Sequence, residues 1–237
     1  MPISAPIHVL KRQARQLARA EAIALHAALD KIAAREGFRA WSLLMARTPE
    51  PLASKAWWTG LDVGDLVLIA GRPGQGKTRM AMELLIETAI RGRPGTFFTL
   101  EYTEADVMRL LSALGVEARD VPSSLTVDTS DAICADYIID AMAAAPRGSI
   151  VVIDYLQLLD QKREHPPLAA QVEALRSFAL AQGLVIACIS QVDRKFDLSR
   201  REFPGPDDVR LPNPLDLTLF AKCCFVNEGK VEVRTLT

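Results

Sequence analysis

The sequence lacks the long apolar run that a membrane span requires, and its N-terminus lacks the apolar core of a signal peptide. Its four cysteines, Cys134, Cys188, Cys223 and Cys224, have no metal-ligand spacing and are interpreted as reduced thiols. The three histidines are scattered, which favours packing or surface positions over a metal site. These absences argue against a membrane protein, a disulfide scaffold and a zinc module. We expect a cytoplasmic protein that makes no membrane contact.

The chain also lacks a strong overall charge. Its 28 Lys/Arg and 29 Asp/Glu give a net charge of −1, so bulk charge does not indicate a nucleic-acid partner. Residues 1–50 nevertheless carry eight basic and four acidic side chains. Residues 7–47 show helical periodicity, with Lys11, Arg15 and Arg19 spaced four apart on one face. This prefix is either a helical cap with a solvated basic face, which we favour, or a nucleic-acid contact.

The rest of the sequence alternates between strand-like and helical segments. Prolines and the Trp57-Trp58-Thr59-Gly60 stretch indicate a linker over 51–60, between a prefix at 1–50 and a main domain at 61–237. The pattern predicts an α/β fold with a mainly parallel sheet flanked by helices, then a long loop over 193–214 and a C-terminal β-hairpin. We expect strands at 66–70, 96–100, 125–127, 150–154, 184–189, 217–226 and 230–236, and helices at 77–91, 104–114, 131–144 and 168–181.

The strongest local signal begins at Leu66, where an apolar run leads into a glycine-rich turn and a helix-prone segment. Gly71, Gly76, Lys77 and Thr78 fit the phosphate-binding pattern G-x-x-x-x-G-K-[ST]. Glycines let backbone N–H groups curl around a polyphosphate, a lysine reaches the β- and γ-phosphates, and a threonine hydroxyl binds Mg²⁺. We therefore predict a site for ATP or GTP with Mg²⁺. The predicted nucleotide-binding set is Gly71, Arg72, Pro73, Gly74, Gln75, Gly76, Lys77, Thr78 and Arg79.

Three further polar residues end predicted strands or follow them closely, at the edge where open α/β sheets bind ligands. Asp154 ends an apolar run, as the metal-binding carboxylate of a Walker B strand does, and is predicted to hold Mg²⁺ together with Thr78. Glu101 is the candidate base for the attacking water, although a glutamate in the first turn of a helix is a competing interpretation. Gln191 is a candidate contact to the γ-phosphate, so Glu101, Lys77 and Gln191 form the predicted catalytic set.

Four stretches resemble the motifs of the DnaB-like replicative helicases, which are RecA-like ATPases. The resemblance covers about 60–237, and Asp-Tyr-Leu-Gln-Leu is its most specific part. It implies a RecA-type sheet, hydrolysis of ATP with Glu101 as base and Asp154 on Mg²⁺, and a homo-oligomeric ring or filament. The inner loops of that assembly, at about 160–167 and 193–213 here, would grip single-stranded DNA. The stretches are Gly71-Arg72-Pro73-Gly74-Gln75-Gly76-Lys77-Thr78, Thr99-Leu100-Glu101, Ile150–Leu159 and Ile189–Arg194.

The sequence departs from that family in three places. Only the helical prefix stands where the family has a large N-terminal domain that contacts primase. Cys224 stands at the position of the family's arginine finger, which leaves Lys222 or Arg234 as candidate trans-acting cations. Leu211-Pro212-Asn213-Pro214 replaces the glycine- and serine-rich stretch of the second loop. Two functions therefore stay open: a DnaB-like ATPase that acts on DNA as a helicase, and a RecA-like module that uses ATP to assemble or signal without unwinding.

Overall fold

The computed structural model describes residues 4, 7–41, 43–44, 57–116, 120–160, 164–199, 201–211 and 213–236. The chain divides into two compact units, Met1–Leu52 and Ala53–Thr237. Each unit has a hydrophobic core of its own. None of the described helices combines the length and the apolar character that a membrane crossing requires.

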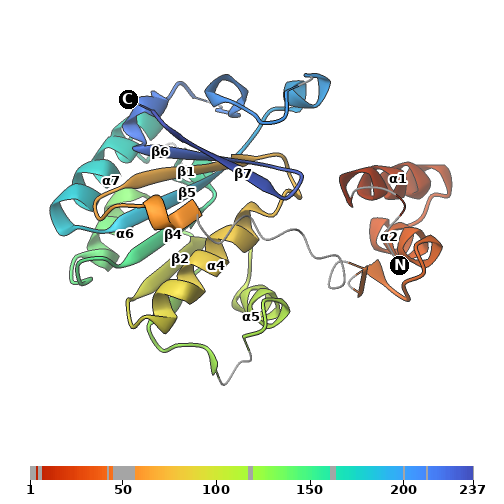
Figure 1. Cartoon of the computed structure of the whole chain (residues 1–237), viewed down its shortest axis with the longest axis horizontal. Helices are drawn as coiled ribbons and strands as arrows, with labels where there is room; N and C mark the ends of the chain where they lie inside the picture. The colour runs from red at the N-terminus through yellow and green to blue at the C-terminus, as the bar shows by residue number, and fades with distance from the viewer. Residues whose placement is uncertain are drawn as a thin grey trace. The chain divides into compact units, whose positions relative to one another are not determined.

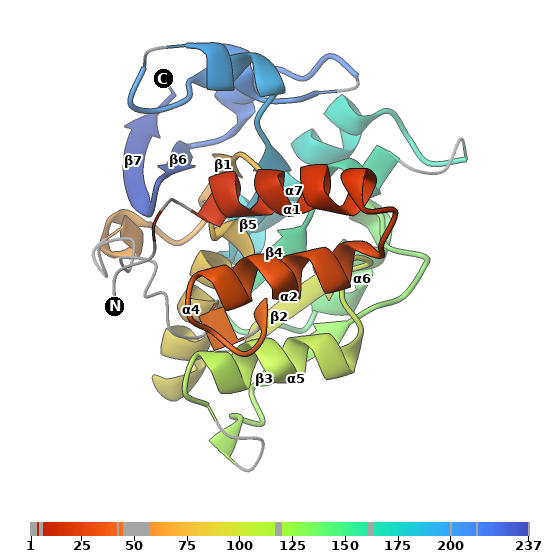
Figure 2. The same ribbon diagram turned by 90° about the vertical axis from the view of Figure 1, so that its right-hand side faces the viewer.

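The first unit is built on two helices, α1 (Ile7–Ala20) and α2 (Leu25–Arg35), which lie side by side (Figure 2). Their apolar residues recur at helical spacing and meet in a small core that includes Leu10 and Ile32, both buried. Gly37 follows α2 with a φ of 84°, a left-handed conformation that glycine adopts without strain. The helices expected in the prefix are therefore confirmed for the residues described.

The basic face predicted for the prefix lies on α1. Arg15 and Arg19 are exposed there, whereas the side chain of Lys11 lies outside the described part of the chain. Residues 45–56, which include the end of the segment with helical periodicity and most of the predicted linker, also lie outside it.

The second unit is organised around a seven-stranded sheet with the order β3-β2-β4-β5-β1-β6-β7 (Figure 1). All neighbouring strands are parallel except β6 and β7, which form an antiparallel hairpin. The predicted mainly parallel sheet with a C-terminal hairpin is thus confirmed. The strands are β1 (Leu66–Gly71), β2 (Gly95–Thr99), β3 (Leu125–Asp128), β4 (Ile150–Asp154), β5 (Val185–Gln191), β6 (Lys222–Asn227) and β7 (Lys230–Thr235).

Four helices cover the two faces of this sheet. They are α4 (Lys77–Ile90), α5 (Glu104–Ala113), α6 (Ala135–Met142) and α7 (Leu168–Gln182). Helices α4 and α5 pack on one face, and α6 and α7 on the other (Figure 1). Successive residues of β1 alternate between the two cores, since Leu66 and Leu68 join the α6/α7 side while Val67 and Ile69 join the α4/α5 side. Because both faces are covered, the central strands need apolar residues at every position.

The structure corrects two of the predicted boundaries. The helix expected over 131–144 is shorter, because Cys134 has an extended backbone and α6 begins only after it. The hairpin strand expected from residue 217 begins at Lys222. Residues 217–219 instead form a 3-10 turn that is capped by the carboxylate of Asp216, which accepts the backbone N–H of Thr218.

The long loop expected over 193–214 has more internal structure than its composition suggested. It contains two 3-10 turns, Arg194–Leu198 and Pro206–Asp208. An isolated antiparallel bridge pairs Val192 with Val209, and both side chains are buried. The described part of this loop therefore folds back on the end of β5 and packs there.

Candidate active site

The glycine-rich turn connects β1 directly to α4, as its motif predicted. Gly74 and Gly76 have φ values of 81° and 88°, which a residue with a side chain would adopt only under strain. At Gly71, a Cβ atom would lie 2.7 Å from the carbonyl oxygen of Val226 on β6, so close strand packing also requires glycine. The first N–H groups of α4 have no acceptor within the helix and point toward this turn. The turn is thus shaped to bind an anion.

The strand order brings the predicted site residues to one edge of the sheet. Strands β1, β5, β4 and β2 are consecutive neighbours. Their register places Gly71 beside Gln191 and Asp154 beside Thr99, and Glu101 follows β2 by two residues. The carboxyl ends of parallel strands are where open α/β sheets bind their ligands. The geometry therefore joins residues that are up to 120 positions apart, Gly71 and Gln191, in one site.

Thr78 and Asp154, the predicted metal pair, are in direct contact. Thr78 Oγ1 donates a hydrogen bond of 2.8 Å to Asp154 Oδ2. Burial raises the pKa of Asp154 to about 6, an effect that the Thr78 hydroxyl opposes. Carboxylate and hydroxyl oxygens are ligands that Mg²⁺ prefers, so this pair fits the ion.

The described part of the chain offers no larger cluster of acidic ligands for a magnesium ion. Among the residues that the structure describes, no group of three or more His, Cys, Asp or Glu could hold a metal ion. Magnesium sites of nucleotide-binding proteins take one or two ligands from the protein and the others from phosphates and water. The donor set found here agrees with that type of site.

Lys77 is the first residue of α4 and only 8% exposed. Its Nζ donates a hydrogen bond of 3.2 Å to the carbonyl oxygen of Arg72 within the same turn. Burial lowers the pKa of Lys77 to about 8, while the charges of Asp154 and Glu101 act in the opposite direction. A phosphate held by the turn would bring further negative charge to this ammonium and raise its pKa again.

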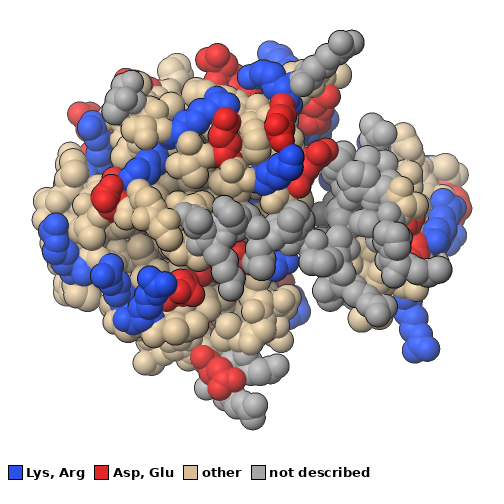
Figure 3. Space-filling model, in the orientation of Figure 1, with Lys and Arg blue, Asp and Glu red and all other residues tan. Residues whose placement is uncertain are grey.

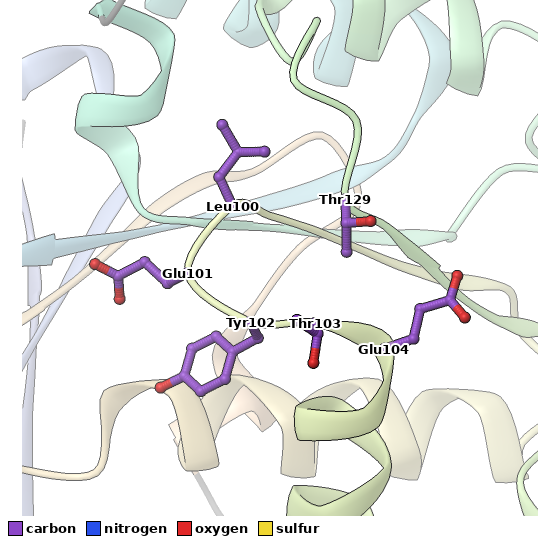
Figure 4. Close-up of a pocket in the computed structure, with 6 residues that line it drawn as sticks. All are labelled: Leu100, Glu101, Tyr102, Thr103, Glu104 and Thr129. Carbon is purple, nitrogen blue, oxygen red and sulfur yellow. The ribbon is translucent and has the colours of Figure 1, made fainter.

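Glu101 lies in the segment between β2 and α5, and its backbone N–H donates to the Thr99 hydroxyl at 3.1 Å. Helix α5 begins at Glu104 and is capped by Thr103, so Glu101 precedes the helix. The interpretation of Glu101 as a first-turn helix glutamate is therefore wrong. Figure 4 shows the Glu101 and Glu104 side chains projecting in opposite directions from this segment, with the ring of Tyr102 below it on the Glu101 side.

A pocket of about 320 Å³ opens beside this segment, at the ends of β2 and β3. It is lined by Leu100, Glu101, Tyr102, Thr103, Glu104 and Thr129 (Figure 4). The exposed Glu101 side chain lies on the border of this solvent-accessible space. A carboxylate in that position has access to water.

Gln191 is half-buried at the end of β5, and its carbonyl oxygen accepts the Arg210 N–H at 2.7 Å. Gln157, from the motif after β4, reinforces the same junction. Its Nε2 donates to the Arg210 carbonyl oxygen at 2.7 Å and to the Ser190 hydroxyl at 3.2 Å. The ends of β4 and β5 and the returning loop are thus fastened together. The sequence placed Gln157 in a motif, but nothing in it indicated which groups the side chain would contact.

Two contacts of the phosphate-binding turn were not predicted from the sequence. Gln75 Oε1 accepts the backbone N–H of Glu228 at 2.7 Å, which ties the turn to the tip of the β6–β7 hairpin. Arg72 forms an ion pair with Asp197 in the 193–214 loop. No local pattern could have indicated either contact, because the partners lie more than a hundred residues apart.

Both candidate trans-acting cations, Lys222 and Arg234, form ion pairs with acidic residues of the same chain. Cys224 is fully buried in the core on β6, so no cationic group stands at that position. Lys222 donates to Asp65 at 2.5 Å and to Asp62 at 3.0 Å, two acidic residues that precede β1. Arg234 pairs with an acidic neighbour on β7, and its guanidinium lies 5.1 Å from the centre of an aromatic ring on β6.

The charge on the visible surface of this unit is mixed. In the view of Figure 3, basic and acidic side chains are interspersed over the described part of the unit. Ion pairs of this unit include Lys230 with Glu202 and Arg201 with Asp208. Within the described residues of this face, no extended basic field is seen, in agreement with the mixed charge of the sequence.

The architecture defined here, a parallel sheet with a phosphate-binding turn after β1 and an acidic residue at the end of β4, is that of a P-loop ATPase domain. The family model described as "ATPase: KaiC" matches residues 28–169, more than half of the chain. The chain belongs to this family.

Relatives among the replicative helicases confirm the resemblance found in the motifs. The chain is 29% identical over 178 residues to a "Probable plasmid replicative DNA helicase" of Chlamydia muridarum, with 62% of this chain and 39% of that protein covered. It therefore spans about two fifths of the length of that relative. Other curated relatives, among them the "Replicative DNA helicase DnaB" of Treponema pallidum, are covered to a similar extent.

Two solved structures share the fold. A structure of a DnaB-like replicative helicase, studied for its interactions with primase, aligns with a TM-score of 0.59 and 16% identity, covering 92% of this chain and 64% of that one. A KaiC-like protein from Pyrococcus horikoshii OT3 aligns with a TM-score of 0.55 and 19% identity, covering 75% and 79%. At these identities the likeness establishes the RecA-like fold alone.

Proposed function

We propose that this chain binds ATP with Mg²⁺, hydrolyses the β–γ bond and acts on DNA in the manner of a DnaB-like helicase. One observation carries the proposal. The glycine-rich turn, the Thr78–Asp154 pair and Gln191 converge on the carboxyl edge of three adjacent strands, β1, β5 and β4. A triphosphate, a metal ion and an attacking water need such an arrangement together.

In this proposal the first residues of α4 and the turn before it hold the phosphates. Lys77 leaves the Arg72 carbonyl oxygen and donates to the β- and γ-phosphates, which restores the charge that burial disfavours. Thr78 and Asp154 hold Mg²⁺, which neutralises charge that develops on the phosphate oxygens during transfer. Glu101 orients and deprotonates the water, and Gln191 contacts the γ-phosphate at the end of β5.

The action on DNA rests on the relatives rather than on a surface of this chain. The names of the curated relatives describe DNA helicases, and the chain matches about two fifths of their length. Single-stranded DNA is accordingly the proposed partner, bound by a homo-oligomeric ring or filament. The described part of the 193–214 loop lies next to Gln191, so a strand bound there would be close to the γ-phosphate sensor.

An ATPase assay with and without single-stranded DNA, at low salt, tests both parts of the proposal. We expect Mg²⁺-dependent turnover that the DNA stimulates, and loss of turnover in Lys77→Ala because the desolvated ammonium is removed. Arg91→Ala is a matched control, since Arg91 is an exposed cation near the other end of α4 and pairs there with Glu87. Turnover that no nucleic acid alters would refute the action on DNA and leave ATP hydrolysis in place.

The occupied cations favour a second candidate function, a RecA-like module that uses ATP to assemble or signal without unwinding. A rapid motor needs a cation that a neighbouring subunit contributes to the γ-phosphate. Here Lys222 is held by two aspartates of its own chain, and Cys224 is buried. Slow hydrolysis independent of DNA, together with a mass that rises on addition of ATP in light scattering, would identify this function. A monomer under all nucleotide conditions would contradict both candidates.

A further inference from the structure

The side chain of Arg72 leaves the phosphate-binding turn and reaches the loop that follows β5. Its Nε and Nη2 donate to Oδ1 and Oδ2 of Asp197 at 2.9 and 3.0 Å, and its Nη1 donates to the carbonyl oxygen of Val192 at 3.0 Å. Two parallel bonds to one carboxylate fix the orientation of a guanidinium as well as its position. The arginine side chain is 19% exposed and the aspartate side chain 53%, so the arginine side of the pair is shielded from water. Three bonds from one side chain thus define the distance between the turn and the segment after β5.

The segment that receives these bonds is itself a folded piece. Asp193 caps the 3-10 turn that carries Asp197, by accepting the N–H of Lys195 at 2.8 Å. The Asp193 N–H donates to the carbonyl oxygen of Asp208 at 2.7 Å, and Val192 forms the antiparallel bridge with Val209. A displacement of Asp197 would therefore be transmitted to both sides of the described loop, because the two sides are bonded to each other.

Arg72 is also bonded at its main chain to the lysine of the phosphate site. Its carbonyl oxygen accepts the Lys77 ammonium at 3.2 Å. When Lys77 turns toward a phosphate, this bond is exchanged and the turn is fixed by the bound anion. One residue thereby connects the group that meets the nucleotide with the loop at the end of β5.

We propose that the Arg72–Asp197 ion pair couples nucleotide occupancy of residues 71–78 to the order of residues 192–199 and 201–211. Asp197 acts as a positioning residue through Arg72, and it does not touch the nucleotide. The proposal rests on the proposed function, since a nucleotide must occupy the turn. The role assigned to this pair is to connect the phosphate site with the loop after β5. The phosphate-binding motif, Asp154 and Glu101 do not provide that connection.

Hydrogen exchange of the full-length chain, measured by mass spectrometry with and without Mg²⁺-ATP, tests the coupling. In the natural protein we expect ATP to slow exchange in peptides that cover 71–78 and, severalfold, in peptides that cover 192–199. In Asp197→Asn the first effect remains and the second is lost, because an amide cannot accept the charged two-bond contact. Asp207→Asn is the matched control, since Asp207 is an exposed aspartate of the same loop and no side-chain partner is found for it among the described residues. It should behave as the natural protein does.

Two further variants separate coupling from a merely structural role. Asp197→Glu keeps the carboxylate and should recover part of the ATP-dependent slowing. Arg72→Lys keeps the charge near the phosphates but cannot form the two-bond contact, so it should uncouple the loop as Asp197→Asn does. If Asp197 only stabilised the loop, Asp197→Asn would exchange faster in both states, and the difference made by ATP would persist. That result would overturn the proposal.

The outcomes also separate this inference from the proposed function. Slower exchange at 71–78 without any change at 192–199 in the natural protein means that ATP binds and the coupling does not exist. Exchange that ATP leaves unchanged in both segments contradicts ATP binding itself, and with it the proposed function.

Discussion

Replacement of Asp154 by asparagine is expected to stabilise the nucleotide-free protein and to abolish its Mg²⁺-dependent turnover. The carboxylate is 2% exposed, and burial raises its pKa from 3.8 to about 6. The fold therefore binds a proton at this site more tightly than the unfolded chain does. The stability that the proton provides is complete below about pH 4, and it is lost as the pH rises through 6.

The magnitude follows from the size of the shift. Two pKa units correspond to about 3 kcal/mol at neutral pH, and about half of that remains at pH 5. Asparagine removes this cost but keeps an oxygen that accepts the Thr78 hydroxyl at the position where Asp154 Oδ2 does so. The amide N–H groups of asparagine are buried without a carboxylate to accept their hydrogen bonds. They reduce the gain in stability by about 1–2 kcal/mol. A net gain of about 1–2 kcal/mol at neutral pH is expected, or a few degrees in Tm for a domain of this size.

Urea unfolding followed by far-UV circular dichroism, without nucleotide, measures this gain at about pH 7.5 and pH 5. The advantage of Asp154→Asn over the natural protein should shrink by about 1.5 kcal/mol between the two. Asp131→Asn, which changes an exposed aspartate, should differ little from the natural protein at either pH. An Asp154→Asn protein that is less stable at pH 7.5, or whose advantage does not depend on pH, would refute the reasoning from burial. Its ATP turnover, in parallel, should no longer respond to Mg²⁺.

Three other predictions follow from the same site. The pH profile of kcat/KM for Mg²⁺-ATP should be bell-shaped, with limbs near 6 and 8, because Asp154 must be deprotonated and Lys77 protonated in the free protein; a profile flat from pH 5 to pH 9 contradicts this. Glu101→Gln should lower single-turnover hydrolysis by about 10²–10⁴-fold and leave ATP affinity, measured by fluorescence titration, nearly unchanged; weaker binding with normal turnover would assign Glu101 a binding role. Gly71→Ala should lose about 1–3 kcal/mol in thermal unfolding, because its Cβ meets the backbone oxygen of Val226 at 2.7 Å; an unchanged Tm would mean that the strands can separate.

The position of Lys222 bears on which of the two functions is correct. A lysine held by Asp62 and Asp65 is not free to reach a neighbour's nucleotide without breaking two ion pairs. Both aspartates precede β1, and Lys222 begins β6 beside it, so the three residues fasten the amino ends of two neighbouring strands. These ion pairs give Lys222 a role in the stability of the domain. Its position in the motif therefore does not decide between the two functions, whereas the ATPase assay with DNA does.

The sequence was sufficient for most of the sheet, because a doubly covered parallel strand requires an uninterrupted apolar run. β4 was predicted with its observed bounds, and β1 and β2 to within one residue. The sequence-based prediction was wrong where a side-chain hydrogen bond, and not the apolar pattern, determined the local backbone structure. The leucines of the turn before β6 predicted a strand. The Asp216 carboxylate, however, accepts hydrogen bonds from the N–H and hydroxyl groups of Thr218 and so stabilises a 3-10 turn.

For the site, the sequence alone predicted the residue types of each part. The pattern from Gly71 to Thr78 requires glycines for left-handed backbone and a lysine at the start of a helix. Because these constraints are local, they can be recognised in the amino-acid sequence. The acidic end of β4 is local in the same sense. Family membership, supported by the match over residues 28–169, follows from the same motifs.

Only the tertiary structure decided how these parts are connected. The strand order placed Gln191 beside Gly71 and Asp154 beside Thr99, and burial moved the pKa values of Lys77 and Asp154 toward neutrality. The same packing occupied the candidate trans-acting cations and joined the phosphate-binding turn to the loop after β5. Contacts between residues more than a hundred positions apart depend on how the whole chain closes. A local pattern cannot encode them, because it contains only one of the two partners.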